Sequence, residues 1–506
     1  MLNLKKIRSN SIPRIVFVAL AVLLQALWLL LQILKLNHYS VWISMATSIL
    51  SAVVVLKLYS DHTNAAMKMP WILLIVAFPV MGISLYLMVG LLGDPGSTGK
   101  RINRVRRRVE PLLRREGPEL QNPAIANQFR YLQNHNGSPV YANTSVQYFP
   151  EGKHALEAMK ADLEQASDFI FMEYFIVEDG SAFQELLEIL ERKAKEGVQV
   201  RLMYDDIGSV GYVNMGFARS LNEKGIRCLV FNPARPVVNL FMNNRDHRKI
   251  TVIDGKVGFT GGYNLADEYF DRSHPYGHWK DTGIRLEGEA VQGLTATFLE
   301  LWYVASRQEE DYGRFLQIRH SAAAPGLAAP FGDNPMGSER AAENVYLNLA
   351  AQAKSRLWIC TPYLILSDEM IRALGLAAKR GVDVRILTPG IPDKKTVYQV
   401  TRSYFAGLVK QGVRIFAYTP GFCHAKMCIC DEELACIGTS NLDYRSLYHH
   451  FENNVLLYGC PAVTDIGKDF ENTFLISREV TADYRSGRGA MLLLWQCLLR
   501  LFAPLM

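Results

Sequence analysis

The sequence predicts an α/β protein with two similar α/β sandwich half-domains, related by a pseudo-two-fold axis and preceded by N-terminal transmembrane helices. Three observations predict this fold class. Long apolar segments fill most of residues 1–95, strand-like and helix-like segments alternate after about residue 120, and the second part of this alternating region repeats the first. With 506 residues, 49% of them hydrophobic, the chain is long enough to bury more than one core.

The N-terminal region, residues 1–95, contains three apolar segments, at 15–36, 41–59 and 71–92. Each has close to the ~20 residues that a helix needs to cross a bilayer. Three such segments, the first without a cleavage site after it, do not form a signal peptide. We therefore expect two or three transmembrane helices, and Pro79 and Gly82 make the third segment a candidate for a bent or re-entrant path.

Positive charge is concentrated beside the apolar segments, although the net charge of the chain is only +6. A basic juxtamembrane segment at 96–125 follows the third apolar segment, and basic residues also precede the first. The positive-inside rule places both in the cytoplasm, which three full spans cannot satisfy, so either one segment does not cross or the catalytic region faces outward against this rule. We expect a multi-pass protein of the cell membrane with a cytoplasmic catalytic region. We also expect the basic segment to contact anionic lipid headgroups, the alternative being a solvated helix face.

The alternating region contains an internal duplication. Residues 194–205 (AKEGVQVRLMYD) match 378–389 (AKRGVDVRILTP), each with a helix end, a Gly and a strand. Upstream, FIFMEYFI at 169–176 parallels LWICTPYLI at 357–365, an apolar run suited to a buried strand of a mostly parallel sheet. The predicted parts are a first half at 126–320, a connector rich in Ala, Pro and Gly at 321–338, a second half at 339–485 and an apolar C-terminal segment at 486–506. The last of these forms either a core helix or a strip on the membrane.

One motif occurs once in each half with the same spacing. HRKITVIDGKVGFTGGYN begins at His247, and HAKMCICDEELACIGTSN begins at His424. On a strand, the period of two places His247 and Lys249 on one face, and it does the same for His424 and Lys426. Two such pairs facing each other supply two cations for the oxygens of a phosphodiester, one imidazole to attack phosphorus and another to protonate the leaving alcohol. This chemistry needs no metal and no other cofactor.

Further polar residues repeat in or near the motif. Asn264 and Asn441 end the two copies, and their amides could hold phosphate oxygens of the substrate. Asp281 and Glu452 lie at similar distances beyond the histidines. They are candidates for the carboxylates that orient the two rings, because a histidine nucleophile needs its second nitrogen fixed.

Several residues have a simpler interpretation. Asp254 and Asp431 complete each His-Lys-Asp set and are counted with the candidate catalytic residues, but each begins a turn, so we favour a structural role for them. The eight cysteines lack a paired C-x-x-C spacing and are interpreted as packed thiols rather than metal ligands. Surface or packed positions are also expected for four histidines without a partner in the other copy and for three residues near strand ends: His274, His278, His449, His450, Glu173, Tyr174 and Tyr363.

The motifs resemble those of the phospholipase D superfamily, and the similarity is greater to its bacterial cardiolipin synthases. It rests on NNRDHRKITVIDG, GFTGGYNLADEY, WKDTGIRLEG and CHAKMCICD with GTSNLDYRS, and it extends over almost the whole chain. The resemblance implies a phospholipase D-like fold for both halves. It also implies that a phosphatidyl group passes between two phosphatidylglycerol molecules, giving cardiolipin and glycerol through a phosphohistidine. In this scheme His247 is the nucleophile, His424 the acid and later the base, and the two lysines hold phosphoryl oxygens.

Three alternatives remain open. The same chemistry with water or another alcohol as the acceptor would make a phospholipase D hydrolase or a different phosphatidyltransferase. A nuclease of the same superfamily is disfavoured, because the sequence has no nucleic-acid-binding module besides the basic segment. A catalytically silent membrane scaffold is disfavoured, because it would have no need for a complete His and Lys pair in each half.

Overall fold

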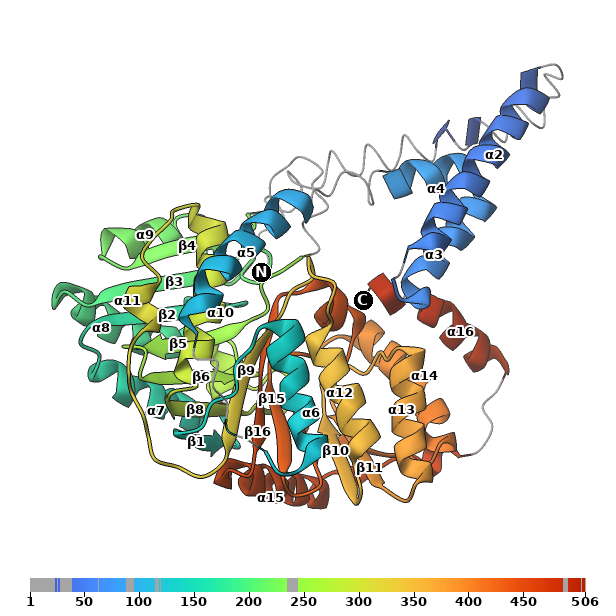
Figure 1. Ribbon diagram of the computed structural model, residues 1–506. Coiled ribbons are helices and arrows are strands. Elements are labelled where there is room, and N and C mark those ends of the chain that lie inside the picture. Colours follow the sequence, from blue (N-terminus) through green and yellow to red (C-terminus); the bar gives the residue numbers. More distant parts are fainter. Residues whose placement is uncertain are drawn as a thin grey trace. The chain divides into compact units, whose positions relative to one another are not determined.

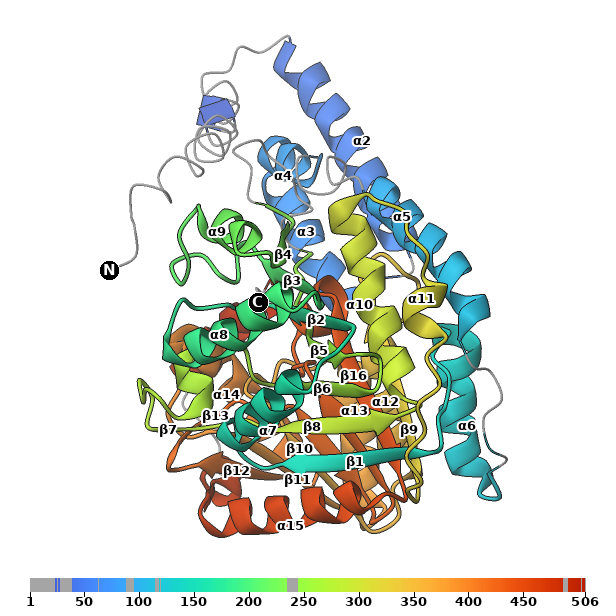
Figure 2. The same cartoon turned by 90° about the vertical axis from the view of Figure 1, so that its left-hand side faces the viewer.

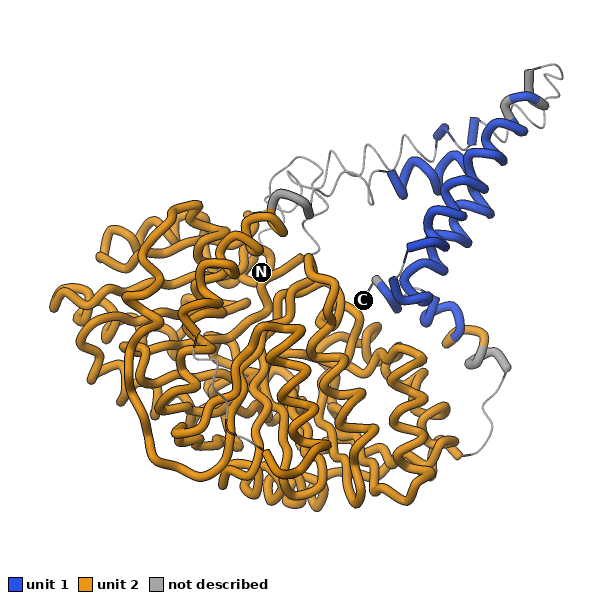
Figure 3. The backbone as a smooth tube through the Cα atoms, in the orientation of Figure 1, with its two compact units in different colours: residues 1–96, 234–243, 497–505 blue, residues 97–233, 244–496, 506 orange. Residues whose placement is uncertain are grey.

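The computed structural model of the chain (Figure 1) describes residues 23–24, 26–27, 39–61, 63–87, 95–113, 118, 120–233, 244–485, 490–501 and 503–505. It divides into two compact units (Figure 3). Unit 1 comprises residues 1–96, 234–243 and 497–505, and unit 2 comprises residues 97–233, 244–496 and 506. The candidate site lies entirely in unit 2, so each unit is described by itself.

Unit 1 contains three apolar helices, α2 (Tyr39–Ser60), α3 (Ala65–Ala77) and α4 (Pro79–Tyr86). They share a small core of Val54, Leu58, Ile75 and Ile83. The segment predicted at 71–92 is divided at Phe78, because Pro79 begins a new helix. Gly82 allows the two helices to approach, since a Cβ there would lie 2.7 Å from Cα of Ile75. The bend expected from these two residues is therefore present.

The apolar segments led us to expect two or three transmembrane helices in this region. Within the described ranges, no helix is both long enough and apolar enough to cross a bilayer, contrary to the expectation from the apolar segments. Most of the first predicted segment, 15–36, lies outside the described residues.

The first half of unit 2 is built on a seven-stranded sheet. Its strand order is β1 (Thr144–Phe149), β8 (Gly283–Gly288), β6 (Val257–Gly261), β5 (Lys249–Ile253), β2 (Phe169–Tyr174), β3 (Gln199–Asp205) and β4 (Arg227–Phe231). The first motif supplies β5 and β6, which pair antiparallel at the middle of the sheet. Its histidine and lysine therefore stand where β5 begins.

The second half is built on an eight-stranded sheet in the same order. The strands are β9 (Leu327–Asp333), β16 (Glu452–Tyr458), β15 (Leu434–Gly438), β14 (Met427–Cys430), β10 (Arg356–Cys360), β11 (Asp383–Pro389), β12 (Arg414–Tyr418) and the added edge strand β17 (Arg478–Glu479). The predicted duplication and the α/β class are thereby confirmed. The expectation of mostly parallel sheets is wrong, because only β2–β3–β4 and β10–β11–β12 run parallel.

Helices cover both sheets (Figure 2). They are α5 (Pro95–Val109), α6 (Pro123–Tyr131), α7 (Gly152–Glu164), α8 (Ser181–Lys195), α9 (Phe217–Glu223), α10 (Val291–Ser306), α11 (Gly313–Leu316), α12 (Ala341–Gln352), α13 (Asp368–Lys379), α14 (Lys395–Lys410) and α15 (Pro461–Leu475). The last helix, α16 (Ala490–Leu501), is divided between the two units and is not one of them. The matched pair α8 and α13 each end at a glycine with positive φ, 94° at Gly197 and 93° at Gly381. This repeats the helix–glycine–strand unit that the aligned segments predict.

The predicted connector at 321–338 is wrong in part, because residues 327–333 form the buried strand β9. Its composition looks like a loop, with Ala328, Ala329, Pro330 and Gly332 in succession around one Phe. Proline is tolerated here because β9 is an edge strand paired only to β16 within its sheet, so its missing N–H leaves no ladder bond unmade.

One hydrophobic core joins the two sheets. It includes Phe171 and Ile250 from the first sheet and Ile429 and Ile437 from the second. A separate core lies between the first sheet and helices α7 to α9. Because both motif strands, β5 and β14, are buried along their whole length, the two motifs are held rigidly near the boundary between the halves.

Candidate active site

A short sheet made from both halves brings the two motifs together. β7 (His278–Lys280) pairs parallel with β13 (Gly421–Cys423), and the matching bridge on the other side joins Asp246 to Phe451. The backbone N–H of His424 donates to the carbonyl of Lys280 at 2.8 Å, and that of His247 donates to the carbonyl of Phe451 at 2.9 Å. Asp281 follows Lys280, and Glu452 follows Phe451. Each motif histidine therefore lies next to a carboxylate residue of the other half.

Each histidine is oriented by the carboxylate of the other half. His247 Nδ1 lies 2.9 and 3.0 Å from the two carboxylate oxygens of Glu452, and His424 Nδ1 lies 2.6 Å from Oδ2 of Asp281. The two residues expected to orient the rings do contact them, and each contacts the histidine of the other half. The cause is the pairing of β7 with β13, which crosses between the halves. With Nδ1–H donating to a carboxylate, Nε2 keeps its lone pair for a reacting atom.

The two lysines lie beside their histidines, as the strand period predicts. Lys249 Nζ donates to the carbonyl of His247 at 2.7 Å, and Lys426 Nζ lies 2.9 Å from Nε2 of His424. Both side chains are almost fully buried. Burial lowers the pKa of Lys249 to about 7 and that of Lys426 to about 8. An anionic phosphate between them would favour the charged form of both.

Both motif histidines favour the neutral form when no substrate is bound. Burial and then the charge of Lys426 lower the pKa of His424 to about 4, against the opposing effect of Asp281. Burial and the charge of Lys249 lower the pKa of His247 well below its ordinary value. Neutral imidazole is the form in which Nε2 can attack phosphorus or accept a proton.

The two carboxylates differ in their environment. Burial alone would raise the pKa of Asp281, but the charges of His424 and Lys426 keep it below its usual range. Burial raises the pKa of Glu452 well above its usual range, with Lys249 opposing. Asp281 therefore favours its ionised form in the site, whereas burial disfavours the ionised form of Glu452.

The predicted phosphate ligands Asn264 and Asn441 differ in the hydrogen bonding of their side-chain oxygens. Asn264 is buried, and its Oδ1 accepts from the backbone N–H of Ile176 at 3.1 Å. Asn441 is buried with its Oδ1 unbonded among the described residues. A third amide, Asn453, holds the first motif directly, since its Oδ1 accepts from the N–H of Lys249 at 3.1 Å. A role of the first two in binding phosphate stays a prediction.

Asp254 and Asp431 lie away from the histidines and brace the motif loops. The Asp254 carboxylate accepts from three successive backbone N–H groups, residues 167–169, at 2.8–2.9 Å. Asp431 does the same for residues 354–356 at 2.8–3.2 Å. Asp254 lies five positions after Lys249, which is about 16 Å along an extended strand. The structural role favoured for Asp254 and Asp431 fits these contacts, and a catalytic role for them stays a prediction.

The rest of the first motif is supported from the opposite face of β5. Arg248 points away from the histidine, as the strand period predicts, and donates to Glu300 at 3.0 Å. Glu173 lies 3.9 Å from the same guanidinium and is fully buried, so it packs rather than contacting substrate.

The eight cysteines are all free thiols, and seven are buried, which agrees with packing.

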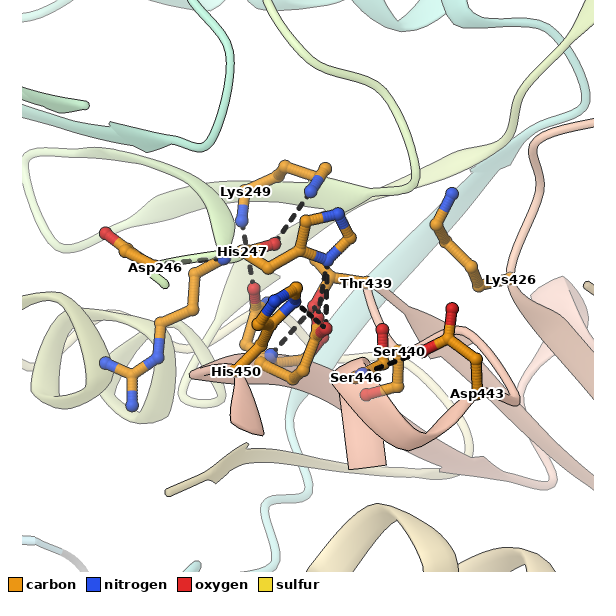
Figure 4. Close-up of polar contacts among 12 residues, drawn as sticks. Asp246, His247, Lys249, Lys426, Thr439, Ser440, Asp443, Ser446 and His450 are labelled. Atoms are coloured by element: carbon orange, nitrogen blue, oxygen red, sulfur yellow. Dashed lines mark hydrogen bonds and ion pairs between the residues drawn. The ribbon is translucent and has the colours of Figure 1, made fainter. Parts of the chain in front are cut away.

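His450 is a site residue that the sequence interpretation left out. Its ring centroid lies 5.5 Å from that of His247, and the two rings lie next to each other in Figure 4. The equivalent position in the first half is Trp279, whose ring lies 5.4 Å from that of His424. Aligning H-W-K-D with H-H-F-E on their carboxylates would have revealed this match, and also the match of His278 with His449.

The sequence matches the family described as "Cardiolipin synthase, PLD-like domain" over residues 159–302 and 346–474. Residues 46–90 match a second family, described as "Phospholipase_D-nuclease N-terminal". An uncharacterized protein of Streptococcus mutans is 40% identical over 457 residues, which cover 89% of this chain and 99% of that protein. A protein of Halalkalibacterium halodurans named cardiolipin synthase is 32% identical over 484 residues, covering 92% and 95%.

The fold is shared with a solved structure, phosphatidylserine synthase of Haemophilus influenzae Rd KW20. The two superpose with a TM-score of 0.56 at 15% identity, over 75% of this chain and 97% of that one. At this identity the likeness concerns the fold alone. Together with the family matches over both halves, it agrees with the duplicated sheets and the paired motifs. This chain therefore belongs to the phospholipase D superfamily and carries two PLD-like domains of the cardiolipin synthase type.

Proposed function

We propose that this protein is a cardiolipin synthase, which transfers a phosphatidyl group from one phosphatidylglycerol to another and releases glycerol. The observation that carries the proposal is the crossed site, in which two histidines, each bonded to a carboxylate of the other half, stand with two buried lysines. Relatives named cardiolipin synthase, about as long as this chain, support the choice of substrate.

The proposed reaction proceeds in two displacements at phosphorus. The anionic phosphodiester favours the protonated form of His424 when it binds. Nε2 of His247 then attacks the phosphorus of the first phosphatidylglycerol, and the bond to the glycerol oxygen breaks as Nε2–H of His424 gives that oxygen its proton. His424 then takes a proton from a hydroxyl of the second phosphatidylglycerol. That hydroxyl oxygen attacks phosphorus and releases His247. Lys249 and Lys426 stabilise the charge on the non-bridging oxygens in both steps.

The assignment of roles rests on the two carboxylates. A general acid must hold a proton before it gives it away, and the ionised Asp281 stabilises the protonated form of His424. Glu452, whose pKa is raised by burial, gives less stabilisation to a cation and suits a ring that attacks in its neutral form. His247 is accordingly the nucleophile and His424 the acid and base.

Surface features of unit 2 support a lipid substrate at a membrane surface. The loop at 206–215 exposes four apolar side chains, Ile207, Val210, Tyr212 and Met215, the last of them 80% exposed. The same loop packs on Phe175, whose ring lies 4.9 Å from that of His247. Apolar groups this close to the site would enter the lipid interface and keep water from the intermediate. We propose that the protein works at the cell membrane, with its catalytic region on the cytoplasmic side.

Helix α5 supports the proposed contact with anionic headgroups. Ile102, Val105 and Val109 form its buried face, while Arg104 and Arg107 are exposed. Arg106 is instead ion-paired with Glu300 at 2.5 Å, so the basic run serves both packing and surface charge. Arg114 and Arg115, the last of the run, lie outside the described residues.

The test is incubation of the purified full-length protein with phosphatidylglycerol alone, followed by mass analysis of the lipids. The proposal expects cardiolipin and glycerol in equal amounts, and neither product from His247→Ala or His424→Ala. Phosphatidic acid in place of cardiolipin would show that water is the acceptor and that the protein is a hydrolase. Absence of both products would remove phosphatidylglycerol as the substrate.

A further inference from the structure

His450 is a buried histidine that the proposed reaction does not use. It is 8% exposed, and among the residues that the structure describes neither of its ring nitrogens has a hydrogen-bond partner. Its Nδ1 lies 3.8 Å from Oε1 of Glu452. A buried polar group without a hydrogen bond destabilises the fold, so this ring is unfavourable at its position unless a ligand bonds to it.

Three ligand atoms converge beside this ring. One atom each from His247, His450 and Glu452 lie within 4.8 Å of one another, and all three residues are buried. Two imidazole nitrogens and one carboxylate oxygen are the donors of many Zn²⁺ sites, in which a water completes a tetrahedron. Imidazole also favours Zn²⁺ and its neighbours over Mg²⁺ and Ca²⁺, which prefer oxygen ligands.

The pseudo-two-fold axis does not repeat this cluster. In the first half the residue two positions before the carboxylate is Trp279, whose indole has no lone pair to give to a metal. The surroundings of His424 are aromatic, with Trp279, Tyr269 and Phe422 all within 5.7 Å between ring centroids. Of the two motif histidines, His247 therefore has a second imidazole, that of His450, beside it, and His424 has the indole of Trp279 instead.

We propose that His247, His450 and Glu452 bind a transition-metal dication of the Zn²⁺ type, and that the bound ion inactivates His247. In the metal-free protein, Nδ1–H of His247 donates to Glu452, and Nε2 carries the lone pair. A metal at Nδ1 takes the lone pair of that atom, so the single ring proton moves to Nε2. Protonated Nε2 cannot attack phosphorus, while the Glu452 oxygen freed of its hydrogen bond binds the ion.

The binding test uses the purified full-length protein without lipid substrate, titrated with Zn²⁺ by calorimetry and with Co²⁺ by visible absorption. The variants are His450→Trp, which installs the residue of the first half, and His450→Phe. The control is His274→Phe, which removes an exposed histidine 3.4 Å from Asp271, a His–carboxylate pair on the surface. We expect one tight ion per chain in the native protein and the control, and binding at least about tenfold weaker in both His450 variants. Equal affinity in all four proteins, or no binding in the native one, would overturn the site.

The inhibition test rests on the proposed function, whereas the binding test does not. Phosphatidylglycerol turnover is measured against added Zn²⁺ and again after a chelator, each protein being compared with its own metal-free rate. We expect reversible inhibition of the native protein and the His274→Phe control, with the half-inhibiting concentration at least about tenfold higher in His450→Phe. Stoichiometric binding without loss of turnover would overturn the inactivation. No turnover in any protein before metal is added would instead count against the cardiolipin synthase proposal and leave the binding result to decide the site.

Discussion

Lys249 links the charge of the site to the stability of the fold. Its ammonium is buried, and burial lowers its pKa to about 7, far below the value of the same group in an unfolded chain. Between these two values the unfolded chain holds a proton that the native protein has released. Stability therefore rises with pH across this window, and the penalty for the charged, buried form is fully present below pH 7.

Lys249→Met should weaken this dependence. The native protein should gain more in melting temperature between pH 7 and 9.5 than the variant does, because the variant has no ammonium to discharge. Thermal unfolding at several pH values measures the two slopes. Lys379→Met, at an exposed position on α13, is the control and should keep the native slope. Identical slopes for Lys249→Met and the native protein would contradict the argument.

The crossed carboxylates should be separable by kinetics. A phosphatidyl ester with a nitrophenol leaving group needs no acid in the first step, so only the second step then depends on His424. Asp281→Asn should keep a burst of nitrophenol and lose turnover, whereas Glu452→Gln should lose the burst itself, each by at least about tenfold. Stopped-flow absorbance measures both phases. The reverse pattern would exchange the roles of His247 and His424.

At this scale the sequence predicted which residues come together in the site but not which histidine each carboxylate contacts. The repeat of His, Lys and a later carboxylate could be found because chemistry requires those residue types at fixed spacing. The contact of Glu452 with His247 in the other half could not be found in this way, because such contacts depend on three-residue strands such as β7 and β13. Strands this short show no sequence pattern. His450 was missed because it matches a tryptophan rather than a histidine.

Among the elements, the loops after β5 and β14 are held by one carboxylate each. Asp254 has φ of +51° and bonds three N–H groups at the start of β2, so its side chain replaces the strand partner that these groups lack. The equivalent Asp431 has φ of +53°. Both positions favour Asp, Asn or Gly because other side chains are strained at positive φ.

Asp254→Ala should therefore destabilise the fold rather than the chemistry. Losing the acceptor for the buried Phe169 N–H and its neighbours should cost about 2–4 kcal/mol. Asp254→Asn, which keeps one carbonyl oxygen and tolerates the backbone, should lose less. Denaturant unfolding gives the free energies, and turnover per folded molecule serves as the comparison. A stable Asp254→Ala protein with lost turnover would support a catalytic role for this residue instead.

The exposed loop at 206–215 predicts a dependence on the form of the lipid. Val210→Ser with Met215→Ser removes exposed apolar surface and should weaken binding to phosphatidylglycerol vesicles about tenfold. The loss of rate should be larger on vesicles than on a soluble short-chain phosphatidylglycerol. Leu376→Ser on α13, also exposed, is the control for the loss of an apolar surface residue elsewhere. Equal losses on both substrates would count against a lipid contact at this loop.

The elements show where composition misleads. The strands β2 and β10 are mostly apolar, which is typical of parallel strands, yet each is parallel on one side and antiparallel on the other. Burial on both faces, rather than direction, sets that composition. The strand β9 was interpreted as part of a connector because Pro330 is tolerated in a strand only at an edge, and edges are not visible in one sequence.

For unit 2 as a whole, the two halves are joined by more than the chain between them. Tyr148 of the first half donates to Asp469 of the second at 2.6 Å, and Lys280 forms an ion pair with the same carboxylate at 2.9 Å. These contacts, the common core and the crossed sheet should hold the halves together after the backbone is cut. The duplication, which set this architecture, could be predicted from aligned segments, whereas the contacts across the axis could not.

A protease site inserted after Ala323, in the loop before β9, tests this cohesion. After cleavage the two fragments should stay associated in size-exclusion chromatography, and the nicked protein should keep most of its turnover. The uncut protein with the same insertion is the control for the insertion itself. Separation of the fragments under native conditions would show that the covalent link is required.

The crossed pairing also bears on how such a chain can arise. In a two-fold pair, a contact from the first copy to the second is repeated from the second to the first. One copy alone would hold a histidine without its carboxylate and a carboxylate without its histidine, so a gene for a single half would encode a working protein only as a homodimer. After duplication and fusion the two copies gain independent mutations, yet Glu452 still contacts His247, and Asp281 still contacts His424. Selection on either half is then selection on the fit between them. The difference between Trp279 in one copy and His450 in the other could not exist in a homodimer of identical halves.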